Sequence, residues 1–199
     1  SPPQSPQAQP AADRFDHADR RGVYRRAALT CVAVLLVPSL VTNANLRAET
    51  ITETIHVTMR DGVKLATDVY RDVTLVRAPV VLTRTPYDRT KQKSTAERWV
   101  KAGYVFVAQD CRGTRASEGV LAPYNNEGQD GYDTIEWLTR QSWCNGRVGM
   151  VGGSYVGAVQ WQAAVENPPG LAVIAPQATW SSFYRTLYLG GAVRLSLIA

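Results

Sequence analysis

The chain has 199 residues, about the length of one domain, and its 22 basic and 17 acidic residues give a formal net charge of +5. The basic residues are dispersed and form no stripe interleaved with aromatic residues, so the composition argues against a nucleic-acid partner. The three cysteines show neither a CxxC pair nor a Cys/His metal spacing, so we expect no metal site, and nothing in the sequence points to a cofactor.

Residues 1–48 are expected to be a leader rather than part of a domain. Residues 1–10 are rich in Pro, Gln and Ser and have too little apolar surface to order themselves. Four arginines between residues 20 and 26 then precede an apolar run over residues 27–37. This order is typical of a secretory signal, and the run is shorter than the roughly 18–20 residues that span a bilayer. We therefore expect export to the periplasm or the extracellular space; an uncleaved N-terminal membrane anchor is the alternative.

The expected domain, residues 49–178, begins with two segments that alternate apolar and polar residues. These are residues 51–58 and 64–70, and the Asp61-Gly62 pair between them is typical of a tight turn. The pattern predicts a β-hairpin at the edge of a sheet. His56 lies in this hairpin among polar neighbours, so we expect its side chain to be exposed.

Strands and helices alternate in the rest of this domain. Strands are expected at residues 79–83, 104–108, 147–151 and 171–175. Helices are expected at residues 94–102, 129–141 and 155–165, with a loop at residues 117–126. Ser94 is the expected N-cap of the first helix. The alternation predicts an α/β fold, a mostly parallel sheet wound by right-handed crossovers with helices on both faces.

A serine flanked by glycines follows the strand expected at residues 147–151. Residues 152–157 read Gly-Gly-Ser-Tyr-Val-Gly. An apolar run that ends in glycines before a helical pattern is typical of a nucleophile elbow, which exposes the Oγ atom of Ser154 on a tight turn. A dinucleotide-binding loop is one alternative, although Ser154 stands where a glycine would let the backbone approach the pyrophosphate. A structural glycine-rich turn with an incidental serine is the other.

No candidate base for Ser154 follows it in the sequence. The two histidines, His17 and His56, precede it, and no Asp, Glu or His comes after Glu166. In α/β-hydrolases the catalytic acid and histidine follow the serine in chain order. The sequence therefore indicates the front part of a serine hydrolase, inactive on its own. A non-catalytic binding protein with the same fold is the alternative.

Further motifs resemble one family. They read Arg-Thr-Pro-Tyr-Asp at 84–88, Ala-Gln-Asp-Cys-Arg-Gly-Thr at 108–114, Ser-Trp-Cys-Asn-Gly-Arg-Val-Gly-Met at 142–150 and Gln-Trp-Gln-Ala-Ala at 160–164. With the serine motif, they resemble the CocE/NonD family of serine hydrolases. That group contains cocaine esterases, α-amino-acid ester hydrolases and X-prolyl dipeptidyl peptidases. The family's serine motif is G-x-S-Y-x-G, which accounts for a closing glycine one residue later than in G-x-S-x-G.

The resemblance implies an α/β-hydrolase core and a role for three residues. Ser154 corresponds to the acylated nucleophile, Tyr155 to a backbone N–H donor in the oxyanion hole, and Tyr87 to a phenol donor there. The implied activity is hydrolysis of an ester or amide acyl bond in a small molecule or short peptide. A peptidase of the X-prolyl dipeptidyl type is the alternative. In the family a helical cap, the acid and the histidine come later, so residues 179–199 are expected to start that cap.

Two further pairs are expected to have structural roles. Asp110 and Arg112 follow the strand at 104–108, and we expect a charge pair that fixes the loop. Cys111 lies at the carboxyl end of that strand, whereas Cys144 precedes the start of another. Parallel strands of about five residues separate these ends by roughly 15 Å, and a disulfide needs Cα atoms within about 7 Å. We therefore expect two unpaired thiols.

Overall fold

The computed structural model describes residues 50–180 and 182–193. The expected leader, with its signal and cleavage site, lies outside the described residues and stays a prediction. In the described part of the chain, no helix has the length and apolar character needed to cross a membrane.

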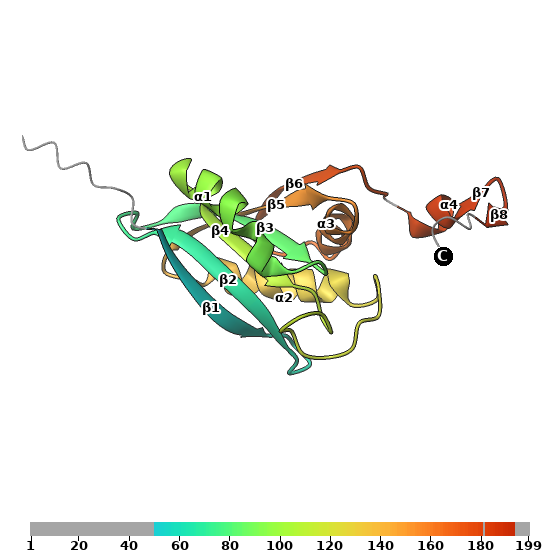
Figure 1. Cartoon of the computed structure of the whole chain (residues 1–199), viewed down its shortest axis with the longest axis horizontal. Coiled ribbons are helices and arrows are strands. Elements are labelled where there is room, and N and C mark those ends of the chain that lie inside the picture. Colours follow the sequence, from blue (N-terminus) through green and yellow to red (C-terminus); the bar gives the residue numbers. More distant parts are fainter. Residues whose placement is uncertain (1–49, 181, 194–199) are drawn as a thin grey trace, which may run out of the picture. The chain divides into compact units, whose positions relative to one another are not determined.

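A six-stranded sheet with the order β1-β2-β4-β3-β5-β6 forms the centre of the domain (Figure 1). Its strands are β1 (Thr50–Thr58), β2 (Lys64–Asp72), β3 (Ala78–Thr85), β4 (Val105–Asp110), β5 (Cys144–Gly153) and β6 (Leu171–Gln177). β1 and β2 form the predicted antiparallel hairpin at one edge, and β2 runs antiparallel to β4. The remaining strand pairs are parallel, as the alternation of strands and helices predicted.

Helices cover both faces of this sheet. They are the 3₁₀-helix η1 (Arg89–Gln92), α1 (Lys93–Lys101), α2 (Glu127–Thr139) and α3 (Tyr155–Val165). Ala96 of α1 packs in one cluster with Val81, whereas Ile135 of α2 and Ala163 of α3 pack with Val80 in another. Adjacent residues of β3 therefore face opposite layers, as the pleat of a strand requires. The predicted α/β architecture is confirmed.

The start of α1 differs from the prediction. Its N-cap is Gln92, which makes no side-chain capping hydrogen bond, and Ser94 already lies inside the helix. The helix is entered directly from η1, whose N-cap Asp88 accepts a hydrogen bond from the backbone N–H of Thr90. The polar residue that starts this helical segment is therefore Asp88, six positions before the serine that the local pattern favoured.

The two described cysteines are both free and buried. Cys111 directly follows β4, and Cys144 is the first residue of β5. They thus lie at opposite ends of parallel strands, and the prediction of two unpaired thiols is confirmed.

The face of β5 and β6 on the side of α1 carries a groove of about 440 Å³. Trp99 and Tyr104 line one part of it, and Val151 and Val173 of the sheet line another. Val173 is 60% exposed, which is unusual for a valine in the middle of a strand. Among the described residues, this strip of sheet remains open on that face.

Residues after Thr179 form short local elements. α4 (Phe183–Leu187) begins at Ser182, whose side chain accepts a hydrogen bond from the backbone N–H of Arg185, and β7 (Tyr188–Leu189) pairs with β8 (Ala192–Val193). That these residues start a cap remains a prediction.

Candidate active site

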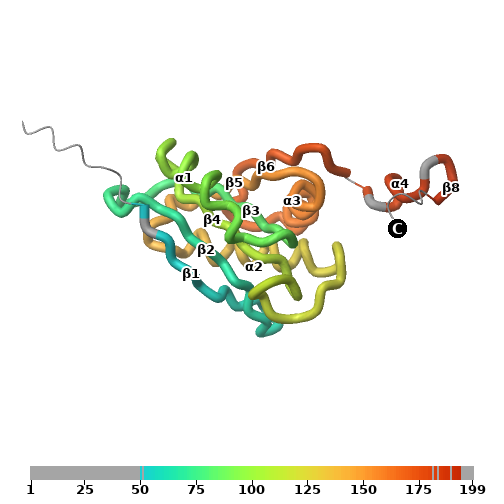
Figure 2. Tube along the Cα trace, in the orientation of Figure 1, coloured from blue at the N-terminus to red at the C-terminus, as the bar shows by residue number. Residues whose placement is uncertain are grey.

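Ser154 lies on the turn between β5 and α3 with its side chain exposed. Its backbone angles are φ 56° and ψ −126°, a region that residues other than glycine rarely adopt. A strained, exposed serine between a strand and a helix is the geometry of a nucleophile elbow. Figure 2 follows the chain through this turn, from β5 into α3 and back along β6.

Backbone hydrogen bonds hold this turn on two sides. The N–H of Ser154 donates to the carbonyl of Gln177 in β6 at 3.0 Å. Its carbonyl accepts from the N–H groups of Gly157 and Ala158, each at 3.0 Å, in the first turn of α3. The strained residue is therefore fixed both to the sheet and to the helix.

Two glycines are required by close packing around the turn. A Cβ atom on Gly152, at φ 138°, would lie 2.2 Å from Cγ1 of Val156, and one on Gly157 would lie 2.7 Å from Cγ2 of Thr179. Contacts this short exclude a side chain at either position without rearrangement. The late closing glycine of the motif is thus explained by the approach of Thr179 to α3.

Tyr155 is the first residue of α3, and its phenol points away from solvent. The hydroxyl donates to Oε1 of Glu127 at 2.8 Å, and the ring stacks on Tyr124 with centroids 4.5 Å apart. Burial, together with the charge of Glu127, raises the pKa of the Tyr155 phenol, which therefore stays protonated. As the first helical residue, Tyr155 has no acceptor for its backbone N–H within α3.

Tyr87 follows the carboxyl end of β3, the strand next to β5. Its backbone N–H donates to Oγ1 of Thr85 at 3.0 Å, and its side chain is 54% exposed. Ser154 follows the carboxyl end of β5. Both residues therefore lie beyond the carboxyl ends of neighbouring parallel strands, where α/β proteins have their active sites.

Arg89 ties the loop that carries Tyr87 to the sheet. Its backbone N–H and its Nη1 donate to the two carboxylate oxygens of Asp110 at 2.8 and 2.7 Å. Its Nε donates to Oδ1 of Asp68 at 3.0 Å. The Asp110 side chain has no exposure to solvent, so the Tyr87 loop is anchored inside the protein.

The predicted charge pair between Asp110 and Arg112 is wrong in its partners. Asp110 pairs with Arg89, whereas Arg112 pairs with Asp61 in the hairpin turn and with Asp130 in α2 at 2.7 and 2.6 Å. β4 ends at Asp110 and the chain turns there, so the two side chains leave toward different elements. Both still fix the loop, as expected of them.

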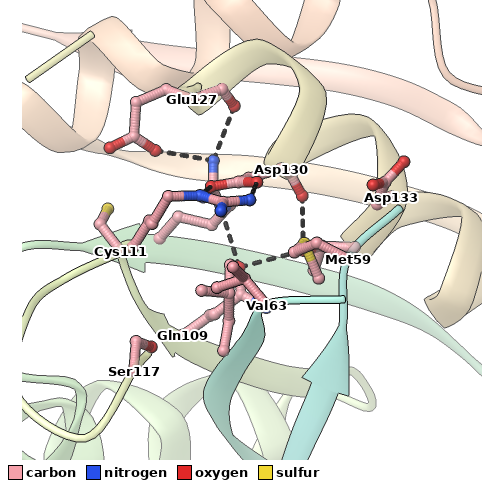
Figure 3. A network of polar contacts seen from close by, with 12 residues as sticks. Met59, Val63, Gln109, Cys111, Ser117, Glu127, Asp130 and Asp133 are labelled. Carbon is pink, nitrogen blue, oxygen red and sulfur yellow. Dashed lines mark hydrogen bonds and ion pairs between the residues drawn. The ribbon is translucent and has the colours of Figure 1, made fainter. Parts of the chain in front are cut away.

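A buried cluster of charged and polar residues, which the sequence analysis missed, lies between β3, β4 and α2. The Arg84 side chain has no exposure; its Nε donates to Oε1 of Gln109 and its Nη1 to the carbonyl of Glu127, both at 2.8 Å. Nη1 also lies 2.9 Å from Oε2 of Glu127. Figure 3 shows Glu127 and Asp130 of α2 on one side of this cluster and Gln109 of β4 on the other.

One signal for this cluster was present in the sequence. Arg84 interrupts an apolar strand, a position at which a charge needs a buried partner. Burial alone lowers the pKa of Arg84, but Glu127 and the neighbouring acidic groups outweigh that effect and raise it, so the guanidinium stays charged.

His56 is exposed, as predicted, on β1 at the edge of the sheet. Three strands, β2, β4 and β3, separate it from β5, which leads to Ser154. In the described part of the chain, no three His, Cys, Asp or Glu side chains are grouped so that they could hold a metal ion.

Comparisons with known proteins agree with this geometry. Residues 61–199 match the X-Pro dipeptidyl-peptidase (S15) family. The chain is 42% identical over 151 residues to the cocaine esterase of Rhodococcus sp. (strain MB1 Bresler), covering 73% of this chain and 26% of that protein. A CocE/NonD family hydrolase from Staphylococcus aureus has a similar structure, with 32% identity, a TM-score of 0.63 and coverage of 68% and 29% of the two chains. The structure of an α-amino acid ester hydrolase is also similar, with 30% identity and a TM-score of 0.62. The match covers 73% of this chain and 28% of that chain.

The chain therefore spans about a quarter of the length of these relatives. Its mostly parallel sheet with helices on both faces matches the α/β-hydrolase-like fold of the two solved structures. The family match covers most of the described domain, including both the Tyr87 loop and the Ser154 turn. The chain belongs to the X-Pro dipeptidyl-peptidase (S15) family, as its motifs indicated.

Proposed function

We propose that this chain carries the nucleophile of a serine hydrolase that cleaves ester or amide acyl bonds through an acyl-enzyme at Ser154. The observation that carries the proposal is the exposed Ser154 at φ 56°, on a strand–helix turn, in a chain of this family. A turn of this kind directs Oγ away from the sheet toward an incoming carbonyl carbon.

The oxyanion of the tetrahedral intermediate would be stabilised by two donors. We assign these roles to the backbone N–H of Tyr155 and to the phenol of Tyr87. Their support is position: Tyr155 begins α3 beside the nucleophile, and the half-exposed Tyr87 follows the strand next to β5. One preorganised donor of this kind is worth roughly 3–4 kcal/mol of transition-state stabilisation.

The general base that deprotonates Ser154 would come from outside this sequence, together with the acid that orients it. The only histidine in the described residues, His56, lies at the opposite edge of the sheet from β6, so it is no candidate. Without a base the hydroxyl of Ser154 stays a weak nucleophile. We therefore assign the activity to a longer protein of which this chain is the nucleophile-bearing part.

The substrate class we favour is a small ester or amide, because the relative at 42% identity is named a cocaine esterase. Peptidase activity of the X-Pro dipeptidyl type is the second candidate, since the family description names it. Turnover of p-nitrophenyl acetate, compared with that of a dipeptidyl X-Pro p-nitroanilide, separates the two.

The nucleophile is tested in a full-length protein with a fluorophosphonate probe, with the adduct mapped by mass spectrometry. We expect one adduct on Ser154 and its complete loss, with loss of hydrolysis, in Ser154→Ala. Ser182, a partly exposed serine at the N-cap of α4 and outside the elbow, provides the control. Labelling that persists in Ser154→Ala, or that is lost in Ser182→Ala, would contradict the assignment.

A further inference from the structure

Three buried groups form a chain of contacts beneath the Ser154 turn. The Tyr155 hydroxyl donates to Oε1 of Glu127 at 2.8 Å, and Oε2 of the same carboxylate lies 2.9 Å from Nη1 of Arg84. Their exposed fractions are 8% for Tyr155, 3% for Glu127 and 0% for Arg84. One oxygen of the Glu127 carboxylate therefore accepts a hydrogen bond from Tyr155, and the other is in ion-pair contact with Arg84.

Stability alone is a weak reason to bury such a pair. Removing a carboxylate and a guanidinium from water costs several kcal/mol per ion, and apolar residues of the same volume often stabilise a fold as well or better. What an ion pair with fixed hydrogen bonds adds is a defined orientation for the groups that it contacts. The group contacted here is Tyr155, the residue that follows Ser154.

The Tyr155 side chain is held at two places. Its ring stacks on Tyr124 and packs with Cys111 and Val159, and its hydroxyl is held by Glu127. A side chain fixed at both its ring and its tip leaves its own Cα little freedom. The backbone N–H of Tyr155, and the peptide that joins it to Ser154, are then fixed in direction.

We propose that Glu127, held in place by Arg84, is a positioning residue that orients the Tyr155 backbone N–H toward the oxyanion. This inference rests on the proposed function, because it assigns an orienting role within the same site. Glu127 acts through Tyr155 and not on the substrate, since its carboxylate is buried, with Oε1 hydrogen-bonded to Tyr155 and Oε2 in ion-pair contact with Arg84.

The test compares Tyr155→Phe, Glu127→Gln and the double variant in a full-length protein. Tyr155→Phe removes only the hydroxyl and keeps both the ring and the ion pair. Gln keeps the shape of Glu127 but has no charge to pair with Arg84, so the Tyr155 hydroxyl loses its charged acceptor. The matched control is Tyr70→Phe, a buried tyrosine on β2 that pairs with Phe106 near the start of β4, away from the elbow.

Each single variant is expected to lower kcat for p-nitrophenyl acetate about tenfold with KM within twofold, since a misdirected donor costs less than the 10²–10³-fold loss of an oxyanion donor removed outright. The rate of fluorophosphonate labelling should fall in parallel. The double variant should be no slower than the slower single one, because both act through one contact. Tyr70→Phe should retain the wild-type kcat.

The outcomes separate this inference from the proposed function. A folded Tyr155→Phe protein with kcat within twofold of wild type would overturn the inference and leave a merely structural pair. If Glu127→Gln does not fold, Tyr155→Phe decides alone. Failure of the wild-type protein to be labelled at Ser154 would instead overturn the proposed function.

Discussion

Ser154 is one of the described residues other than glycine that adopt a positive φ. A φ of 56° with ψ of −126° costs a residue with a side chain roughly 1–3 kcal/mol, and it persists only where the surroundings over-determine it. The hydrogen bonds of Ser154 to Gln177, Gly157 and Ala158 are those surroundings. Backbone strain, which lowers stability, is thus found at the residue that we propose as the nucleophile.

We expect Ser154→Gly to unfold with a free energy about 1 kcal/mol higher than Ser154→Ala, because glycine adopts positive φ without a Cβ penalty and alanine does not. Both variants of the full-length protein should be inactive. Denaturant titration measures the difference. Asn167, exposed with φ 52°, offers a control position: the same Gly and Ala pair there should show the strain effect while activity is retained. Equal stabilities of the two Ser154 variants would mean that the turn is not strained.

At the scale of elements, the sequence predicted a helix accurately where residues that favour a turn lie at both of its ends. The α3 helix was expected at residues 155–165 and is found at Tyr155–Val165, because glycines precede it and Asn167, at positive φ before a proline, follows it. The prediction of Ser94 as the N-cap of α1 was wrong because a 3₁₀-helix precedes α1. The residues around position 94 do not indicate that 3₁₀-helix.

Pairings between elements could not be predicted in this way. Arg84 and Glu127 lie 43 positions apart and meet only because α2 packs on the face of the sheet toward which Arg84 points. The partners of Asp110 and Arg112 likewise depend on η1, the hairpin turn and α2. The motif located the site, whereas the contacts that support it needed the tertiary structure.

The Arg89–Asp110 contact predicts how firmly the Tyr87 loop is held. Asp110→Asn removes the charge from a fully buried partner of Arg89, so we expect a loss of about 2 kcal/mol in unfolding free energy. The labelling rate at Ser154 should also fall if Tyr87 is an oxyanion donor. Asp133→Asn is the control, because Asp133 pairs with the half-exposed Arg60 and should cost less than about 1 kcal/mol. Equal losses in the two variants would show that the Tyr87 loop does not depend on Asp110.

At the scale of the whole molecule, the two edges of the sheet differ in character. β1 exposes Thr52, Glu53, Thr54 and His56, a polar edge of the kind that resists pairing with another chain. The β6 side exposes Val173 and carries the open groove beside α1. Among the described residues, the β1 edge is therefore polar, whereas the β6 side exposes apolar surface.

We propose that residues 1–48 are a leader that directs export of the protein. With its native N-terminus, a full-length protein should be found outside the cytoplasm and begin near Asn45 or Glu49, because a basic segment before a short apolar run directs export and cleavage. N-terminal sequencing of cell fractions measures this. Leu35→Arg, which places a charge inside the apolar run, should leave the precursor in the cytoplasm. Intact wild-type precursor in the cytoplasm would contradict the prediction.

The open groove also has a consequence for synthesis. In the relatives, this segment is about a quarter of the chain. A ribosome adds roughly 5–20 residues per second, so in a protein of that length these strands emerge tens of seconds before the last residues are made. During that interval the valine-lined groove beside α1 would be exposed to solvent. Apolar surface that is exposed in this way promotes aggregation, so we expect the yield of such a protein to rise when a chaperone that shields apolar strands is co-expressed.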